Sequence, residues 1–184
     1  MSSKKYLLLT SDTDEIPKAR FMNALSNCPL PEPFRSSVLI CDFYYYSYEF
    51  RSKTHIHYGS TISLINVNSH SALPTGNSLR DQRFNFKSYP STCFHCTWCF
   101  NQLKIVHRKM ASYSHTEHNQ IQFRQREHIL NRYRYGKDLF DRQGEEYIYL
   151  PNNTDYPELV QIEADRFKYM TKRSNLTNVG FVDA

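Results

Sequence analysis

The stretch that decides the fold is Tyr6–Pro17, YLLLTSDTDEIP. It opens with a continuous apolar run, Tyr6–Leu9, which is typical of a buried β-strand. An acidic segment and Pro17 follow, and this order signals the start of a helix, here over residues 18–26. The pattern therefore predicts a strand that leads through a carboxylate-rich turn into a helix. In open α/β sheets, ligands bind at this end of a strand.

Two carboxylates, those of Asp12 and Asp14, are two residues apart in this segment. In an extended chain such residues point the same way, and carboxylate oxygens are hard ligands suited to Mn²⁺ or Mg²⁺. A metal held there can bridge a nucleotide diphosphate and neutralise the charge of a leaving phosphate. We therefore predict Asp12 and Asp14 as metal ligands. The competing interpretation is a solvated turn and helix cap.

The remaining patterns predict further alternation of strands and helices. We expect strands at 38–50, with a hairpin continuation, at 61–67 and at 103–106, and a loop at 68–79. A helix is expected to start at a capping box, Ser114–Glu117, and to run to Tyr135, with Gly136 as its C-cap. A last helix is expected to start at Asp155. Because strands alternate with helices, we predict an α/β fold. With 184 residues and 40% hydrophobic residues, a single domain over 1–184 is expected.

Composition narrows the function classes. Only 5 glycines are present, and no glycine-rich phosphate loop occurs. No apolar run is long enough to span a bilayer. The net charge of +5 is spread along the chain, so a solvated surface is favoured over a nucleic-acid footprint.

The segment Phe94–Phe100, FHCTWCF, holds the only tryptophan, Trp98, next to His95. It is either a packed, functionally shaped loop or a hydrophobic strand with an incidental histidine. Three cysteines, Cys93, Cys96 and Cys99, follow a C-x-x-C-x-x-C pattern. A zinc site needs four ligands and usually a second C-x-x-C unit, which is absent from the sequence. We therefore favour buried small hydrophobes or a local disulfide over zinc.

Near the predicted helix start, Glu117 is a candidate general base, provided that it reaches a hydroxyl. The alternative is that it serves only as the capping-box carboxylate.

Taken together, these strings resemble glycosyltransferase family 17, which includes the enzyme that adds the bisecting N-acetylglucosamine to N-glycans. The matching strings are SDTDEIP at 11–17, HCTWCF at 95–100, KMASYSH at 109–115 and GKDLF at 136–140. The segment from Tyr156 to Arg173 is similar to the family's C-terminal helix.

The resemblance implies a GT-A-like, Rossmann-like nucleotide-sugar transferase fold. It also implies a UDP-GlcNAc donor, the mannose of an N-glycan core as acceptor, a β-1,4 linkage, a Mn²⁺ or Mg²⁺ cofactor, inversion at the anomeric carbon, and a place in the Golgi membrane or lumen. It implies Asp12 and Asp14 as the metal ligands. Glu117 is the first candidate for the base, and Asp138 and Glu127 are weaker candidates. The residues implied for substrate binding are Glu15, His95, Trp98 and His115.

Only eleven residues precede Asp12, whereas GT-A enzymes place a nucleotide-binding half before this position. We therefore expect this chain to lack that N-terminal half and the membrane anchor of the family. A severed sheet edge leaves backbone groups unpaired, which predicts self-association through an exposed sheet edge. The leading hypothesis is a metal-dependent hexosaminyltransferase. A non-catalytic glycan-binding remnant is the alternative, and no nucleic-acid partner is expected.

Overall fold

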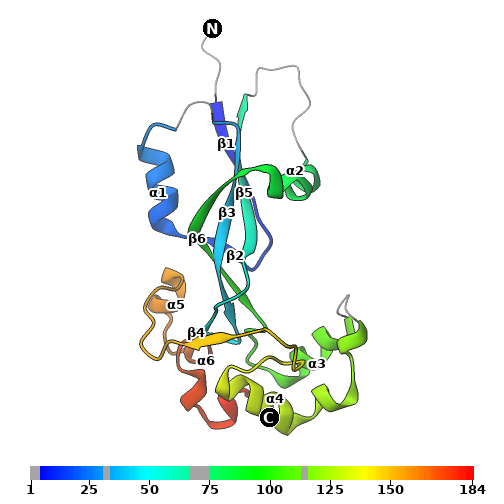
Figure 1. Ribbon diagram of the computed structural model, residues 1–184. Helices are drawn as coiled ribbons and strands as arrows, with labels where there is room; N and C mark the ends of the chain where they lie inside the picture. The colour runs from blue at the N-terminus through cyan, green and yellow to red at the C-terminus, as the bar shows by residue number, and fades with distance from the viewer. Residues whose placement is uncertain (1–4, 31–33, 67–74, 113–115) are drawn as a thin grey trace. The chain divides into compact units, whose positions relative to one another are not determined.

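The computed structural model describes residues 5–30, 34–66, 75–112 and 116–184, and Figure 1 labels their helices and strands. The chain packs as two compact units. Unit 1 consists of Met1–Asp42 and Ile56–His95, and unit 2 of Phe43–His55 and Cys96–Ala184. Two strands, β3 (Ser36–Tyr45) and β6 (Lys87–Thr97), contribute residues to both units. The expectation of a single domain stays a prediction.

Unit 1 is built on antiparallel strand pairs. Its elements are β1 (Lys5–Thr10), β2 (Glu15–Pro17), α1 (Ala19–Asn27), β5 (His57–Asn66), α2 (Gly76–Gln82), a 3-10 helix at Arg83–Asn85 and the unit-1 parts of β3 and β6. Strand β5 pairs with β1 on one side and β3 on the other. Strand β2 pairs with β6, and this register sets Glu15 opposite His95. Two predicted site residues thus become neighbours through backbone pairing alone.

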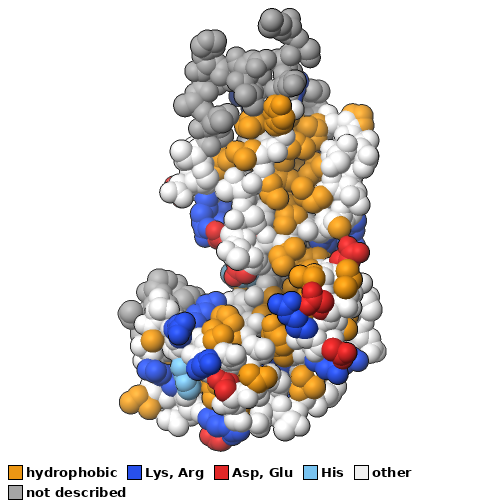
Figure 2. Space-filling view, turned by 180° about the vertical axis from the view of Figure 1, so that it is seen from behind, with side chains coloured by type: hydrophobic (Ala, Val, Ile, Leu, Met, Phe, Trp, Pro, Cys, Tyr) orange, Lys and Arg blue, Asp and Glu red, His pale blue; other side chains and the backbone are white. Residues whose placement is uncertain are grey.

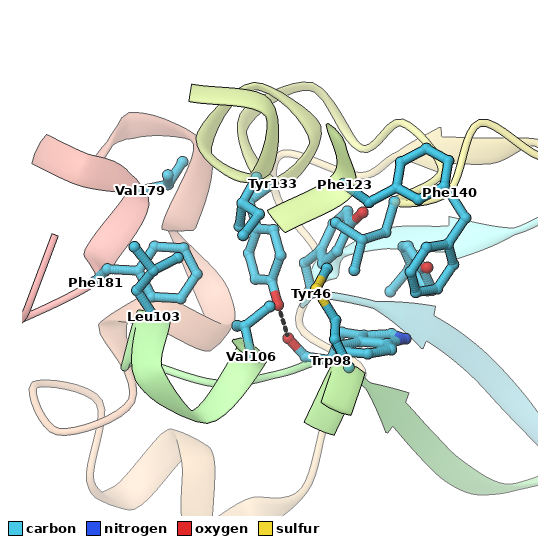
Figure 3. Packing of buried hydrophobic residues seen from close by; sticks show 13 residues of the cluster. Tyr46, Trp98, Leu103, Val106, Phe123, Tyr133, Phe140, Val179 and Phe181 are labelled. Atoms are coloured by element: carbon cyan, nitrogen blue, oxygen red, sulfur yellow. Dashed lines mark hydrogen bonds between the residues drawn. The ribbon is translucent and has the colours of Figure 1, made fainter. Parts of the chain in front are cut away.

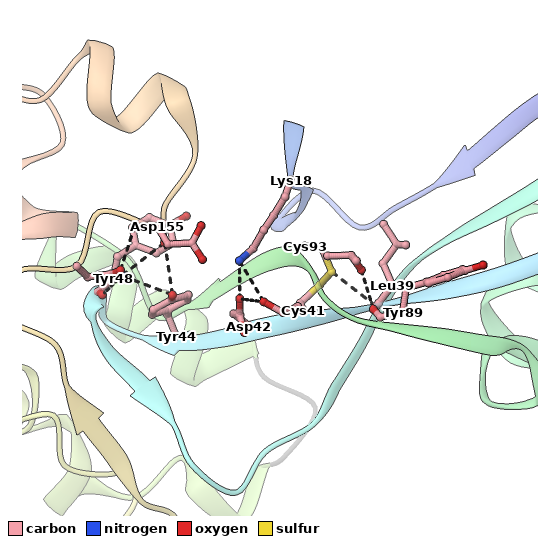
Figure 4. A network of polar contacts seen from close by, with 12 residues as sticks. Lys18, Leu39, Cys41, Asp42, Tyr44, Tyr48, Tyr89, Cys93 and Asp155 are labelled. Carbon is pink, nitrogen blue, oxygen red and sulfur yellow. Dashed lines mark hydrogen bonds and ion pairs between the residues drawn. A yellow bond between two sulfur atoms is a disulfide. The ribbon is translucent and has the colours of Figure 1, made fainter. Parts of the chain in front are cut away.

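A small apolar cluster and a disulfide hold unit 1 together. Its buried members are Phe34, Leu39, Cys41, Ile62 and Cys93, and Cys41 is bonded to Cys93. Beside the disulfide, the Lys18 ammonium lies 2.6 Å from a carboxylate oxygen of Asp42 (Figure 4). Lys18 is only 2% exposed, so this ion pair compensates a charge that would otherwise be costly to bury.

Strand β1 exists as predicted, but it is not buried. Tyr6, Leu7 and Leu9 are 48%, 39% and 39% exposed, and Figure 2 shows hydrophobic side chains gathered on one face of unit 1. The physical reason is position, because β1 lies at one end of the strand order and pairs only with β5 among the described strands. Self-association through this edge stays a prediction, which sedimentation of the purified chain measures directly.

Unit 2 combines a hairpin with short helices around an aromatic core. Its elements are β4 (Ser47–Ser52), α3 (Leu103–Ser112), 3-10 helices at Thr116–His118 and Ile121–Arg124, α4 (Arg126–Tyr135), β7 (Tyr147–Tyr149), α5 (Glu158–Ile162), α6 (Lys168–Thr171) and 3-10 helices at Arg173–Asn175 and Thr177–Gly180. Strands β3 and β4 form the expected hairpin, with Tyr45 opposite Ser47, and β4 pairs antiparallel with β7. The core includes Tyr46, Trp98 and Tyr133 (Figure 3).

Several predicted elements differ from the structure. Residues 103–106 begin helix α3 rather than a strand, because Leu103, Val106 and Met110 recur at helical spacing and are buried together. Helix α4 starts only at Arg126, after two 3-10 turns, although it ends as predicted at Gly136, which has φ 60°. Residues 76–79 are helical, since the Thr75 hydroxyl caps α2 by accepting from the Ser78 N–H.

The last predicted helix is interrupted. It forms as two short helices, α5 and α6, separated by turns at residues 163–167. The pairs of defined register are all antiparallel, so the architecture is mixed α/β and the GT-A-like fold stays a prediction. Among the described residues, no helix has the length and apolar character needed to cross a membrane.

Candidate functional site

The Asp12-Thr13-Asp14 segment forms a tight turn between β1 and β2 rather than an extended strand. The Asp12 N–H donates to a Glu15 carboxylate oxygen at 3.1 Å, and the Glu15 N–H donates to the Asp12 carbonyl, also at 3.1 Å. The Ser11 hydroxyl closes the turn by donating to the Glu15 carbonyl at 2.6 Å. This local bonding fixes the backbone and leaves both aspartate side chains outside it.

The two aspartates have different neighbours. Asp12 forms an ion pair with Arg80, and an oxygen of Asp14 lies 3.7 Å from Nδ1 of His95. The side chains are 39% and 50% exposed, so both carboxylates remain accessible to a ligand. We predicted that the two carboxylates point the same way because we expected an extended backbone. The backbone forms a turn instead, so this reason no longer applies.

Behind the turn lies a buried carboxylate with two stacked imidazoles. Glu15 is 5% exposed, and its Oε1 is 3.0 Å from Nε2 of His57. The His57 and His95 rings stack with their centroids 3.9 Å apart. Burial raises the pKa of Glu15, but the bonds from His57 and the Asp12 N–H, with the charges of both histidines, outweigh it and leave the pKa below its usual value.

A pocket of about 220 Å³ opens beside this turn. Its wall includes Ser11, Asp12 and Glu15 from the turn, Thr61 from β5, and Arg80 and Arg83 from α2 and the following 3-10 helix. Carboxylates and guanidinium groups therefore face one hollow. This pairing suits a ligand that carries anionic groups and accepts hydrogen bonds.

The other predicted site residues belong to unit 2. Trp98 is 3% exposed within the aromatic core, and its carbonyl accepts from the Tyr133 hydroxyl at 2.8 Å (Figure 3). The Glu117 side chain is 61% exposed and lies 3.9 Å from Nε2 of His118. Glu127 is paired with Arg126 at 3.0 Å. His115 lies outside the described residues.

Asp138 is 6% exposed and is engaged by several donors. It accepts from the N–H groups of Phe140 and Arg142 and from the Arg142 guanidinium, the shortest contact being 2.6 Å. These bonds hold the carboxylate against the turn that follows it and engage both of its oxygens. They account for the burial of Asp138 in structural terms, whereas the Glu117 side chain is 61% exposed.

The comparison with protein families identifies a family for this chain. The model of glycosyltransferase family 17 matches residues 2–168, which includes the turn, the pocket and most of the aromatic core. The chain belongs to glycosyltransferase family 17. No curated protein and no solved structure matches it significantly. Membership in this family establishes that the protein is of the glycosyltransferase type, which acts on a sugar donor and an acceptor.

A divalent cation would need oxygen ligands at this candidate site. Within the described ranges, no group of three or more His, Cys, Asp or Glu side chains is arranged to hold a metal ion. Mg²⁺-type sites, however, commonly use one or two carboxylates together with substrate phosphates. The accessible oxygens of Asp12 and Asp14 meet that requirement, with Arg80 as the group that a cation would replace at Asp12.

Sequence reasoning did not find four residues of this candidate site, namely His57, Thr61, Arg80 and Arg83. They lie far along the chain from the turn, and none belongs to a recognisable motif. The one available signal was the strand assignment at 61–67, which placed Thr61 in β5 without indicating which strand it would pair with. The cysteines were anticipated in part, because Cys96 and Cys99 form the local disulfide.

The Glu15–His57 contact yields a pH-dependent prediction. Replacing Glu15 with glutamine should lower the free energy of unfolding at pH 7 by about 1.5–3 kcal/mol, the range for hydrogen bonds to charged groups. Since the folded-state pKa of Glu15 is lowered, its contribution is present above the ordinary value of 4.5 and is lost as the pH falls through the lowered pKa.

Denaturant unfolding at a series of pH values measures this effect. The difference between wild type and Glu15→Gln should narrow on acidification, while the exposed control Glu158→Gln should stay within about 0.5 kcal/mol of wild type throughout. A difference that is constant with pH contradicts the assignment of the charged carboxylate.

Proposed function

We propose that this protein transfers N-acetylglucosamine from UDP-GlcNAc to a mannose of an N-glycan core in β-1,4 linkage. The observation that carries the proposal is a turn whose Asp12 lines a pocket that also contains arginines, with the exposed Asp14 two residues further along the same turn, in a chain matched by the family 17 model. Ligand pockets usually measure about 300–1,000 Å³. A pocket of about 220 Å³ therefore suits part of the donor, such as its diphosphate, rather than all of it.

The reaction is proposed to be metal dependent and inverting. Asp12 and Asp14 would hold Mn²⁺ or Mg²⁺, which when bound supplies positive charge to the departing diphosphate. Inversion requires one base that deprotonates the acceptor hydroxyl as it attacks. Glu117 is the preferred base because its side chain is largely exposed, while both Asp138 oxygens already accept hydrogen bonds.

The substrate-binding roles are proposed from position and from the family resemblance. His95, fixed opposite Glu15 and stacked on His57, is placed at the edge of the turn. Trp98 and His115 are retained as proposed sugar contacts on the family resemblance, and a Golgi location is proposed on the same ground.

A transfer assay tests the function. The chain is incubated with UDP-GlcNAc, Mn²⁺ and a mannose-containing N-glycan core, and the glycan is analysed by mass spectrometry. The expected product carries one additional N-acetylhexosamine, and EDTA should suppress its formation. Glycan binding without any transfer overturns the transferase proposal and identifies a non-catalytic, glycan-binding member of the family.

A further inference from the structure

Two residues in the wall of the pocket carry buried polar groups that have no hydrogen-bond partner among the described residues. Thr61 is 2% exposed, and its hydroxyl has no partner within the described part of the chain. The same holds for the buried Nε of Arg83. Such groups are rare in folded proteins because each carries an uncompensated desolvation cost, and an unbound ion or ligand is a recognised reason for them. Both residues, Thr61 and Arg83, belong to the wall of the same hollow and come from different elements.

The charges around this hollow are unequally compensated. Asp12 is paired with Arg80, and the Glu15 carboxylate is engaged by His57 and the Asp12 N–H. Arg83 makes no ion pair with any described residue, and its guanidinium carbon lies 5.2 Å from the centroid of the Phe84 ring. The positive charge that remains for a ligand is therefore that of Arg83. A guanidinium presents several N–H donors in a geometry that matches phosphate oxygens.

We propose that Arg83 and the Thr61 hydroxyl form a phosphate-binding element that works without metal and holds the diphosphate of the donor. The inference rests on the proposed use of a nucleotide-sugar donor and adds residues to that site. Thr61 donates its O–H and Arg83 its unpartnered Nε–H to phosphate oxygens. Arg80 joins them when a cation takes its place at Asp12. The ligand class is a diphosphate, because the small hollow offers a cationic donor set rather than a broad apolar wall.

Calorimetric titration of inorganic pyrophosphate into the chain in EDTA tests this element. Wild type should bind, and Arg83→Gln should weaken binding by about tenfold or more, the effect of losing a charge-assisted hydrogen bond. Arg35→Gln removes an exposed arginine elsewhere in unit 1 and should leave the affinity unchanged. Failure of wild type to bind, or equal affinities for Arg83→Gln and Arg35→Gln, overturns the proposal.

Thr61→Val supplies a readout that a purely structural role would not give. Because the hydroxyl has no described partner, its replacement by a methyl group should leave the melting temperature unchanged or raise it, while pyrophosphate binding weakens severalfold. A clear loss of stability shows that the hydroxyl is bonded within the protein and contradicts the proposal.

The outcomes also separate this element from the proposed function. Metal-dependent sugar transfer without pyrophosphate binding in EDTA overturns the element and leaves the transferase function intact. Pyrophosphate binding that depends on Arg83, without sugar transfer to N-glycan acceptors, leaves the element intact and overturns the function.

Discussion

Replacing Arg173 with methionine is expected to lower the free energy of unfolding by about 3–5 kcal/mol. Arg173 is fully buried in unit 2, and its guanidinium donates to three backbone carbonyls, those of Tyr169, Val179 and Phe100, at 2.7, 2.8 and 2.5 Å. Each carbonyl left without a donor in a buried site costs about 1–3 kcal/mol. Burial lowers the pKa of Arg173 to about 10, so the side chain is charged at neutral pH.

Removing the charge recovers part of this loss, because a buried cation is itself costly. The guanidinium also lies over the rings of Tyr133, Tyr169 and Phe181 at 5.0–5.3 Å, and these contacts disappear with it. Lys172→Met is the matched control, since it removes the neighbouring exposed cation and should change stability by less than about 0.5 kcal/mol. Thermal unfolding measures both. Equal melting temperatures for the two variants contradict the structural role of Arg173.

Replacing Asp14 with asparagine is expected to reduce sugar transfer by about 10²–10³-fold, which is typical for loss of one group that stabilises developing charge. Asparagine keeps the size of the side chain but removes the negative charge that would attract a divalent cation. Asp12→Asn should have an effect of similar size, and it also releases Arg80 from its ion pair. Both side chains are partly exposed, so the free energy of unfolding should change by less than about 1 kcal/mol.

Initial rates at saturating UDP-GlcNAc and Mn²⁺ measure this loss. Asp165→Asn is the matched control, because Asp165 is 95% exposed and paired only with Lys168 among the described residues. It should keep the rate of wild type. If Asp14→Asn transfers sugar as fast as Asp165→Asn, the two carboxylates do not form the catalytic turn.

A local sequence signal predicted the local structure correctly where one residue type was required at one position. The end of α4 was predicted because only a residue tolerant of positive φ suits that position, and a Cβ at Gly136 would overlap the ring of Phe50. Helix α3 was missed because a four-residue apolar window, Leu103–Val106, is too short to distinguish a strand from a helix. The prediction that β1 is buried was wrong. The sequence does not show which strands become neighbours, so it could not show that β1 would lie at one end of the strand order.

Only the part of the candidate site around the turn and His95 was predictable from the sequence. The turn at Asp12–Glu15 and the segment around His95 stand out as strings, and strand pairing brings Glu15 and His95 together. The rest of the pocket wall includes Thr61 and Arg83, each of which has a buried polar atom without a hydrogen-bond partner among the described residues. No spacing rule encodes that information, because it arises when β5 and the chain after α2 pack beside the turn.

The most direct test of the account is calorimetric titration of UDP-GlcNAc into wild type and Asp14→Ala, each with and without Mn²⁺. The account predicts that Mn²⁺ strengthens binding to wild type and has little effect on Asp14→Ala, which should keep the weaker metal-independent affinity. Absence of donor binding to wild type under both conditions, or an equal gain from Mn²⁺ in the variant, would contradict a donor site at Asp12-Thr13-Asp14.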